Sequence, residues 1–193
     1  MLKKPQGDKH VNETIKQKST GMVLYTLLNY LTVFLIFALL STLASRLFYP
    51  AGFHFDVDES AFIYEYTDLG TLLADSLHAS LGELAVLLVI LFTPLTLIPK
   101  QISAAIFALK GFSCASVICK FINDSTLKEN APIVFAMLAA SVLTACYAAF
   151  ATIFSIDPKR RSVLSAFLRA AVFYPIFAGA ICAVSAIKLY LLS

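Results

Sequence analysis

Charged residues are scarce in this 193-residue chain: 14% of the residues are charged, whereas 59% are hydrophobic. Soluble domains typically carry charge on about a quarter of their residues. The apolar excess therefore indicates a protein that exposes much of its surface to lipid, so membrane lipid is the first expected partner. The net charge is only +3 and the basic residues form no cluster with interleaved aromatic rings, so we expect no nucleic-acid partner.

The sequence also lacks the motifs of common enzyme and metal sites. It contains no HExxH pair of histidines, no phosphate-binding G-x-x-x-x-G-K-[ST] loop and no G-x-S-x-G elbow. The four cysteines all lie in apolar stretches, where cysteine behaves as a small hydrophobic residue. We therefore expect a non-enzymatic chain with no catalytic residues, no cofactor and no metal.

Five apolar runs are long enough to cross a membrane, which takes about 20 mostly apolar residues in a helix. The runs do not alternate as barrel strands do, and inside a bilayer each segment must satisfy its own backbone hydrogen bonds. The sequence therefore predicts an all-α fold, a polytopic transmembrane helix bundle of about five spans in a single membrane domain, 21–193. The predicted spans lie near residues 21–44, 78–98, 101–122, 131–154 and 163–192.

Proline and glycine positions shape these spans. Pro99 separates the second run from the third, because proline lacks a backbone N–H and disfavours helix in the residue before it. The two spans are therefore predicted to form a tight hairpin. Pro175 is expected to kink the fifth span, and Gly179 offers a close-packing position on it.

Basic residues near the ends of the spans predict the orientation. Residues 1–20 carry five lysines, and Lys159, Arg160 and Arg161 fall on the same side between the fourth and fifth spans. Far fewer basic residues fall on the opposite side. Residues 1–20 are therefore predicted to be a cytosolic basic tail of a multi-pass cell-membrane protein whose C-terminus is extracytoplasmic.

Residues 45–77 form an acidic segment that this orientation places outside the cell. Hydrophobic residues recur three or four apart from Ile63 to Leu77, as on one face of an amphipathic helix. This helix either offers a docking surface for a partner or merely covers the bundle. The candidate docking residues are Asp58, Glu65, Asp68 and Asp75.

Lys110 is the most unusual residue, because it interrupts the third apolar run and is followed by Gly111. A charge in the membrane usually faces protein or water. Lys110 and Gly111 are thus candidates for an intramembrane polar contact, at a point where the backbone bends or another helix approaches. The alternative is that Lys110 lies less deep and snorkels to the interface. Glu83, placed by the predicted spans at the outer end of the second one, is the nearest acidic partner.

Ile98-Pro99 and the run Ala108-Leu109-Lys110-Gly111-Phe112-Ser113-Cys114-Ala115 resemble the stage II sporulation protein M family. The overall plan is similar too: a basic tail, one anchor, an acidic outer segment and four further spans. Thr93 or Thr96, and Ala115 or Ser116, stand where that family has glycines. The resemblance implies a polytopic scaffold that recruits extracytoplasmic cell-wall (peptidoglycan) hydrolases during sporulation engulfment and does not cut the wall itself.

The leading hypothesis is therefore a non-enzymatic membrane scaffold for extracytoplasmic cell-wall enzymes. The alternative is the membrane subunit of a transporter, in which the 159–161 loop or the turn at Lys100 meets a cytosolic ATPase. The predicted spans show no polar path for a solute. They also contain no carboxylate or histidine that is expected to lie within the membrane and serve a proton relay. The absence of these features favours the scaffold.

Overall fold

The computed structural model describes residues 7–48, 69–96, 98–123, 126–156 and 163–192, and over these ranges the chain is all-α. The elements in order are α1 (Gly7–Phe48), α2 (Leu69–Phe92), the 3-10 turn η2 (Thr93–Leu95), α3 (Pro99–Asn123), α4 (Ala131–Ile156) and α5 (Val163–Leu192). No strand occurs in the described part of the chain. The predicted fold class is confirmed.

Five segments, one for each α-helix, are long and apolar enough to cross a membrane, and the second runs from α2 through η2. These segments are Gly21–Ser45, Gly70–Leu95, Pro99–Ile122, Ala131–Ser155 and Val163–Leu192. The chain is thus a multi-pass membrane protein. The second span begins earlier than predicted, because the amphipathic pattern before residue 78 continues into the apolar run as one uninterrupted helix, α2.

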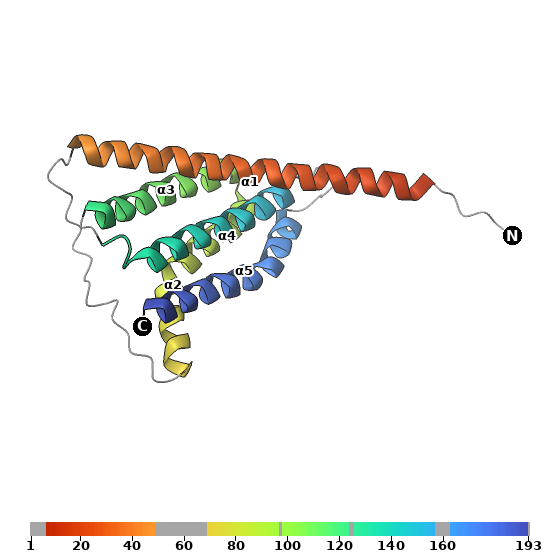
Figure 1. The fold of residues 1–193 in the computed structure, drawn as a ribbon. Helices are drawn as coiled ribbons and strands as arrows, with labels where there is room; N and C mark the ends of the chain where they lie inside the picture. Colours follow the sequence, from red (N-terminus) through yellow and green to blue (C-terminus); the bar gives the residue numbers. More distant parts are fainter. Residues whose placement is uncertain (1–6, 49–68, 97, 124–125, 157–162, 193) are drawn as a thin grey trace.

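Helix α4 is the centre of the bundle. Half of its membrane-spanning window is buried, compared with 17% for α1 and for α5. The α1–α3 pair packs on one side of α4, and the α2–α5 pair packs on the other (Figure 1). The large apolar side chains on the outer faces of α1 and α5 remain exposed, which is the expected state of residues that contact lipid.

The predicted tight hairpin of the second and third spans is not confirmed. Helix α2 packs mainly against α5, and α3 packs mainly against α1, so that α2 and α3 have few close approaches. The connection between them explains the divergence. The chain leaves α2 through η2, which contains Pro94, and Thr96 is extended before α3 starts at Pro99. Because a 3-10 turn and an extended residue separate α2 from α3, the two helices can pack against different neighbours.

Helix α1 is much longer than a membrane span. Its 42 residues begin at Gly7, and residues 7–20 precede the apolar segment without a break in the helix. At 1.5 Å per residue this extension adds about 20 Å. Figure 1 shows it projecting beyond the rest of the bundle. The part of the predicted cytosolic tail from Gly7 onward is therefore a helical continuation of the first span.

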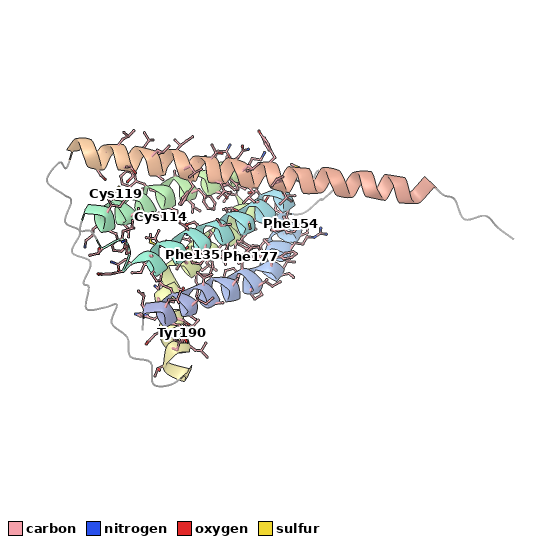
Figure 2. The ribbon with its side chains drawn as sticks, in the orientation of Figure 1. Cys114, Cys119, Phe135, Phe154, Phe177 and Tyr190 are labelled. Carbon is pink, nitrogen blue, oxygen red and sulfur yellow. The ribbon has the colours of Figure 1, made fainter. Side chains whose placement is uncertain are left out.

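Aromatic side chains fill the junction between α4 and α5. Tyr147 and Phe154 of α4 contact rings of α5, with the Tyr147 and Phe177 centroids 5.4 Å apart. Figure 2 labels Phe154 and Phe177 at this junction. Helix α5 contains Pro175 and bends along its length (Figure 1), as expected for an internal proline. The close packing predicted at Gly179 is wrong, because a Cβ built there would meet nothing within 4 Å.

Candidate functional site

The central feature of the membrane region is an ion pair between α2 and α3. The Lys110 Nζ donates to the Glu83 Oε2. The Lys110 side chain is 10% exposed and the Glu83 side chain 31%. This pair joins two helices that otherwise scarcely touch. The intramembrane polar contact predicted for Lys110 is thus present in the structure.

Both partners lie deep in their spans. Glu83 is near the middle of Gly70–Leu95, and Lys110 is near the middle of Pro99–Ile122. At 1.5 Å per residue each Cα is roughly 16–20 Å from either end of its span. The position of Glu83 at the outer end of the second span, and the expectation that no carboxylate lies within a span, are therefore wrong. Both followed from starting that span at residue 78, whereas α2 adds a further nine residues before it.

Ion pairing replaces the snorkelling alternative for Lys110. Its ammonium group is directed to a carboxylate at a similar depth, and its side chain is largely covered by protein. Charged residues in membranes usually pair in this way and mark functional or assembly sites. An apolar run, residues 84–92, follows Glu83, whereas the residues just before it include Ser76, His78 and Ser80, so the sequence indicated a membrane span on only one side of Glu83.

Gly111, the neighbour of Lys110, lies at a point of close approach between α3 and α1. A Cβ built on Gly111 would lie 2.2 Å from the carbonyl oxygen of Phe34 and 2.9 Å from its carbonyl carbon. Only glycine fits there, because the obstacle is backbone and cannot rotate away. The second of the two predicted possibilities, approach of another helix, is therefore correct.

Further polar side chains link the remaining helices. The Tyr30 hydroxyl and the Thr152 Oγ1 are 2.7 Å apart between α1 and α4, and the Ser41 and Ser116 hydroxyls are 3.0 Å apart between α1 and α3. The Tyr147 hydroxyl donates to the carbonyl of Ala170 over 3.1 Å, between α4 and α5.

Two weaker contacts involve sulfur. The Ser80 Oγ lies 3.4 Å from the Cys182 Sγ between α2 and α5, and Cys114 approaches Ser141 between α3 and α4 at 3.9 Å. Cys114 lies one turn beyond Lys110, on the side of α3 that faces α4 (Figure 2). The four cysteines are free thiols; Cys114 is buried and the other three are half-buried.

Of the four candidate docking residues in the outer segment, only Asp75 lies within the described residues. Asp58, Glu65 and Asp68 lie outside the described residues. Asp75 is half-buried on the first turns of α2. On those turns the predicted apolar face points outward, with Leu73 53% and Leu77 52% exposed.

No group of three or more His, Cys, Asp or Glu side chains that could hold a metal ion is found in the described ranges. No family model, no curated protein and no solved structure matches the chain. The resemblance to the stage II sporulation protein M family therefore stays a prediction.

Proposed function

We propose that this multi-pass membrane protein is a non-enzymatic scaffold that holds other proteins at the cell membrane. The proposed partners are extracytoplasmic cell-wall hydrolases, which is the partner class that the family resemblance implies. In this proposal the part of the acidic segment that lies between the first two spans, residues 46–69, forms the outer docking surface, and the bundle provides a fixed support beneath it.

The observation that carries the proposal is how the intramembrane polar side chains are used. Hydrogen bonds or the ion pair link six pairs of helices: α1–α3, α1–α4, α2–α3, α2–α5, α3–α4 and α4–α5. Such bonds are worth about 0.6 kcal/mol each on average within membranes. Several acting together favour one arrangement of the five helices, and a fixed arrangement suits a support for other proteins.

The transporter-subunit alternative keeps one specific observation in its favour. Glu83 and Lys110 form an acid–base pair at the middle of the membrane, and intramembrane ionisable residues often mark ion or proton pathways. A transporter would break and re-form this ion pair during its conformational cycle, whereas a scaffold would keep it formed.

Co-purification from native cells in a mild detergent distinguishes these functions. The tagged wild-type chain is compared with a variant whose outer carboxylates are neutralised (Asp58→Asn, Glu65→Gln, Asp68→Asn) and a variant whose inner loop is neutralised (Lys159→Gln, Arg160→Gln). For a scaffold, peptidoglycan enzymes accompany the wild type and the inner-loop variant, and their yield falls at least fivefold with the outer variant. A cytosolic nucleotide-binding subunit that is lost only from the inner-loop variant would establish the transporter instead.

A further inference from the structure

Glu83 of α2 and Ser113 of α3 are partly or fully exposed polar residues near the middle of their spans. Each lies on the flank of its helix that is nearer to the other helix. We define the α2/α3 seam as Ala79, Glu83 and Val86 of α2 together with Ile106, Lys110 and Ser113 of α3. Helical geometry places each trio on one flank of its helix, because the residues are three or four positions apart. Glu83 is 31% exposed on this seam, and Ser113 is exposed.

The Glu83 carboxylate has more capacity for hydrogen bonds than Lys110 uses. A carboxylate offers about four acceptor positions. The Lys110 ammonium occupies Oε2, no other hydrogen bond to Glu83 is found within the described residues, and the side chain is 31% exposed. Lipid tails at this depth have no donor to offer, so an acceptor facing them is unfavourable.

Ser113 behaves differently from the other hydroxyls around it. Ser116, one turn further on, donates to the carbonyl of Phe112 in its own helix and also contacts Ser41 of α1. For Ser113, no such bond is found within the described residues, and its side chain points away from the core. The seam therefore presents both an acceptor and a hydroxyl at the middle of the membrane.

The seam also carries a small exposed residue. Ala79 is small and exposed, and Val86 and Ile106 are partly buried against the core. The opposite flank of α2 carries large exposed side chains, Leu81 at 54% and Leu88 at 45%. Small residues beside polar ones are typical of surfaces where membrane helices associate.

We infer that a transmembrane helix of a partner membrane protein lies along the α2/α3 seam and places a hydrogen-bond donor opposite Glu83. The donor is a Ser, Thr, Asn, Gln, Lys or Arg side chain near the middle of the partner's helix. This inference rests on the proposed scaffold function and assigns it a second, intramembrane contact. A second copy of this chain is a poorer occupant, because a two-fold interface presents the same patch twice and would bring two Glu83 carboxylates together.

Photocrosslinking in the native cells tests the contact with the full-length chain. Ala79 is replaced by p-benzoylphenylalanine in one variant, and Ala85, an exposed alanine on the opposite flank of α2, is replaced in the matched control. The Ala79 probe is expected to capture one transmembrane peptide of a different protein, with a donor residue near its middle, at a yield at least tenfold above the Ala85 probe. Equal yields at both positions, capture of lipid only or capture of this chain itself would overturn the inference.

A substitution pair tests the role of the carboxylate without leaving a buried charge alone. The double variant Glu83→Leu, Lys110→Leu removes both charges, and replacement of a buried ion pair by apolar residues often preserves the fold. With the Ala79 probe, the crosslink is expected to fall at least fivefold while the monodisperse elution of the chain in detergent is retained. An unchanged crosslink would show that Glu83 does not hold the partner.

The outcomes separate this inference from the proposed function. Co-purification of cell-wall enzymes that is lost with the outer carboxylates, with no Ala79 crosslink, would retain the scaffold and refute the seam. The absence of any specific companion would refute both.

Discussion

Replacement of Gly111 by alanine tests the close contact of α3 with α1 at Phe34. The added Cβ would lie 2.2 Å from the Phe34 carbonyl oxygen, whereas non-bonded carbon atoms pack at about 3.5–4.0 Å. The two helices must therefore separate by roughly 1 Å at this point. A gap of 0.5–1 Å forfeits about a quarter to a half of the dispersion attraction of the atoms concerned.

The expected magnitude follows from two opposing terms. Overpacking costs about 1–3 kcal/mol, and the upper part of that range applies here because the obstacle is backbone. Alanine recovers up to about 1 kcal/mol by its better helix propensity. We expect Gly111→Ala to lower the free energy of unfolding by about 2 kcal/mol.

Gly82→Ala and Gly179→Ala are the matched controls, because a Cβ at either position meets nothing within 4 Å. These variants keep only the propensity gain, so we expect them to be neutral or more stable than wild type by up to about 1 kcal/mol. Equilibrium unfolding of the purified proteins in mixed micelles, with SDS as denaturant, measures the three changes. Equal stability of Gly111→Ala and Gly82→Ala would refute the close approach of α3 to Phe34.

Three further predictions concern the ion pair, the core and the topology. Lys110→Leu should lower the free energy of unfolding by about 2–4 kcal/mol, because it leaves the Glu83 carboxylate unpaired. The double Glu83→Leu, Lys110→Leu variant should recover most of this lost stability in the same assay. No recovery would argue against the ion pair. Tyr30→Phe removes a 2.7 Å hydrogen bond to α4 but keeps the stacked ring contact with α3, so a loss of about 0.6–1 kcal/mol is expected, and a larger loss would mean that the ring itself has moved. For the topology, Asp58→Cys should react with a membrane-impermeant thiol reagent in intact cells and Lys159→Cys should not; the reverse pattern would invert the predicted orientation.

The sequence alone determined that the chain is all-α and contains five segments long and apolar enough to cross a membrane as helices. Length and apolarity are sufficient for this conclusion, because a segment in lipid must satisfy its backbone hydrogen bonds within itself. Pro99 was predicted only as a break between the second and third spans; the structure places it as the first residue of α3, where the first helical turn does not need its N–H. Lys110 and Gly111 also stood out in the sequence, because a charge and a glycine are unusual in the middle of an apolar run.

The sequence placed Glu83 incorrectly because the start of the second span was ambiguous. Residues 69–77 combine exposed leucines with Asp75, so they read as a surface helix, yet they continue into α2. A nine-residue change in the start of the helix moves Glu83 from the end of the span to its middle. The boundary of the helix, and with it the depth of the carboxylate, required the structure.

Only the tertiary structure decided which helices touch. In a soluble protein the buried face of a helix is more apolar than its exposed face, and the sequence reveals it. Here the side chains that face lipid are as apolar as those in the core, so nothing in the pattern indicated that α3 packs on α1 instead of α2. The contacts that define the arrangement, Gly111 against Phe34, Glu83 with Lys110 and Tyr30 with Thr152, join residues distant in the sequence, and their pairing depends on packing in three dimensions.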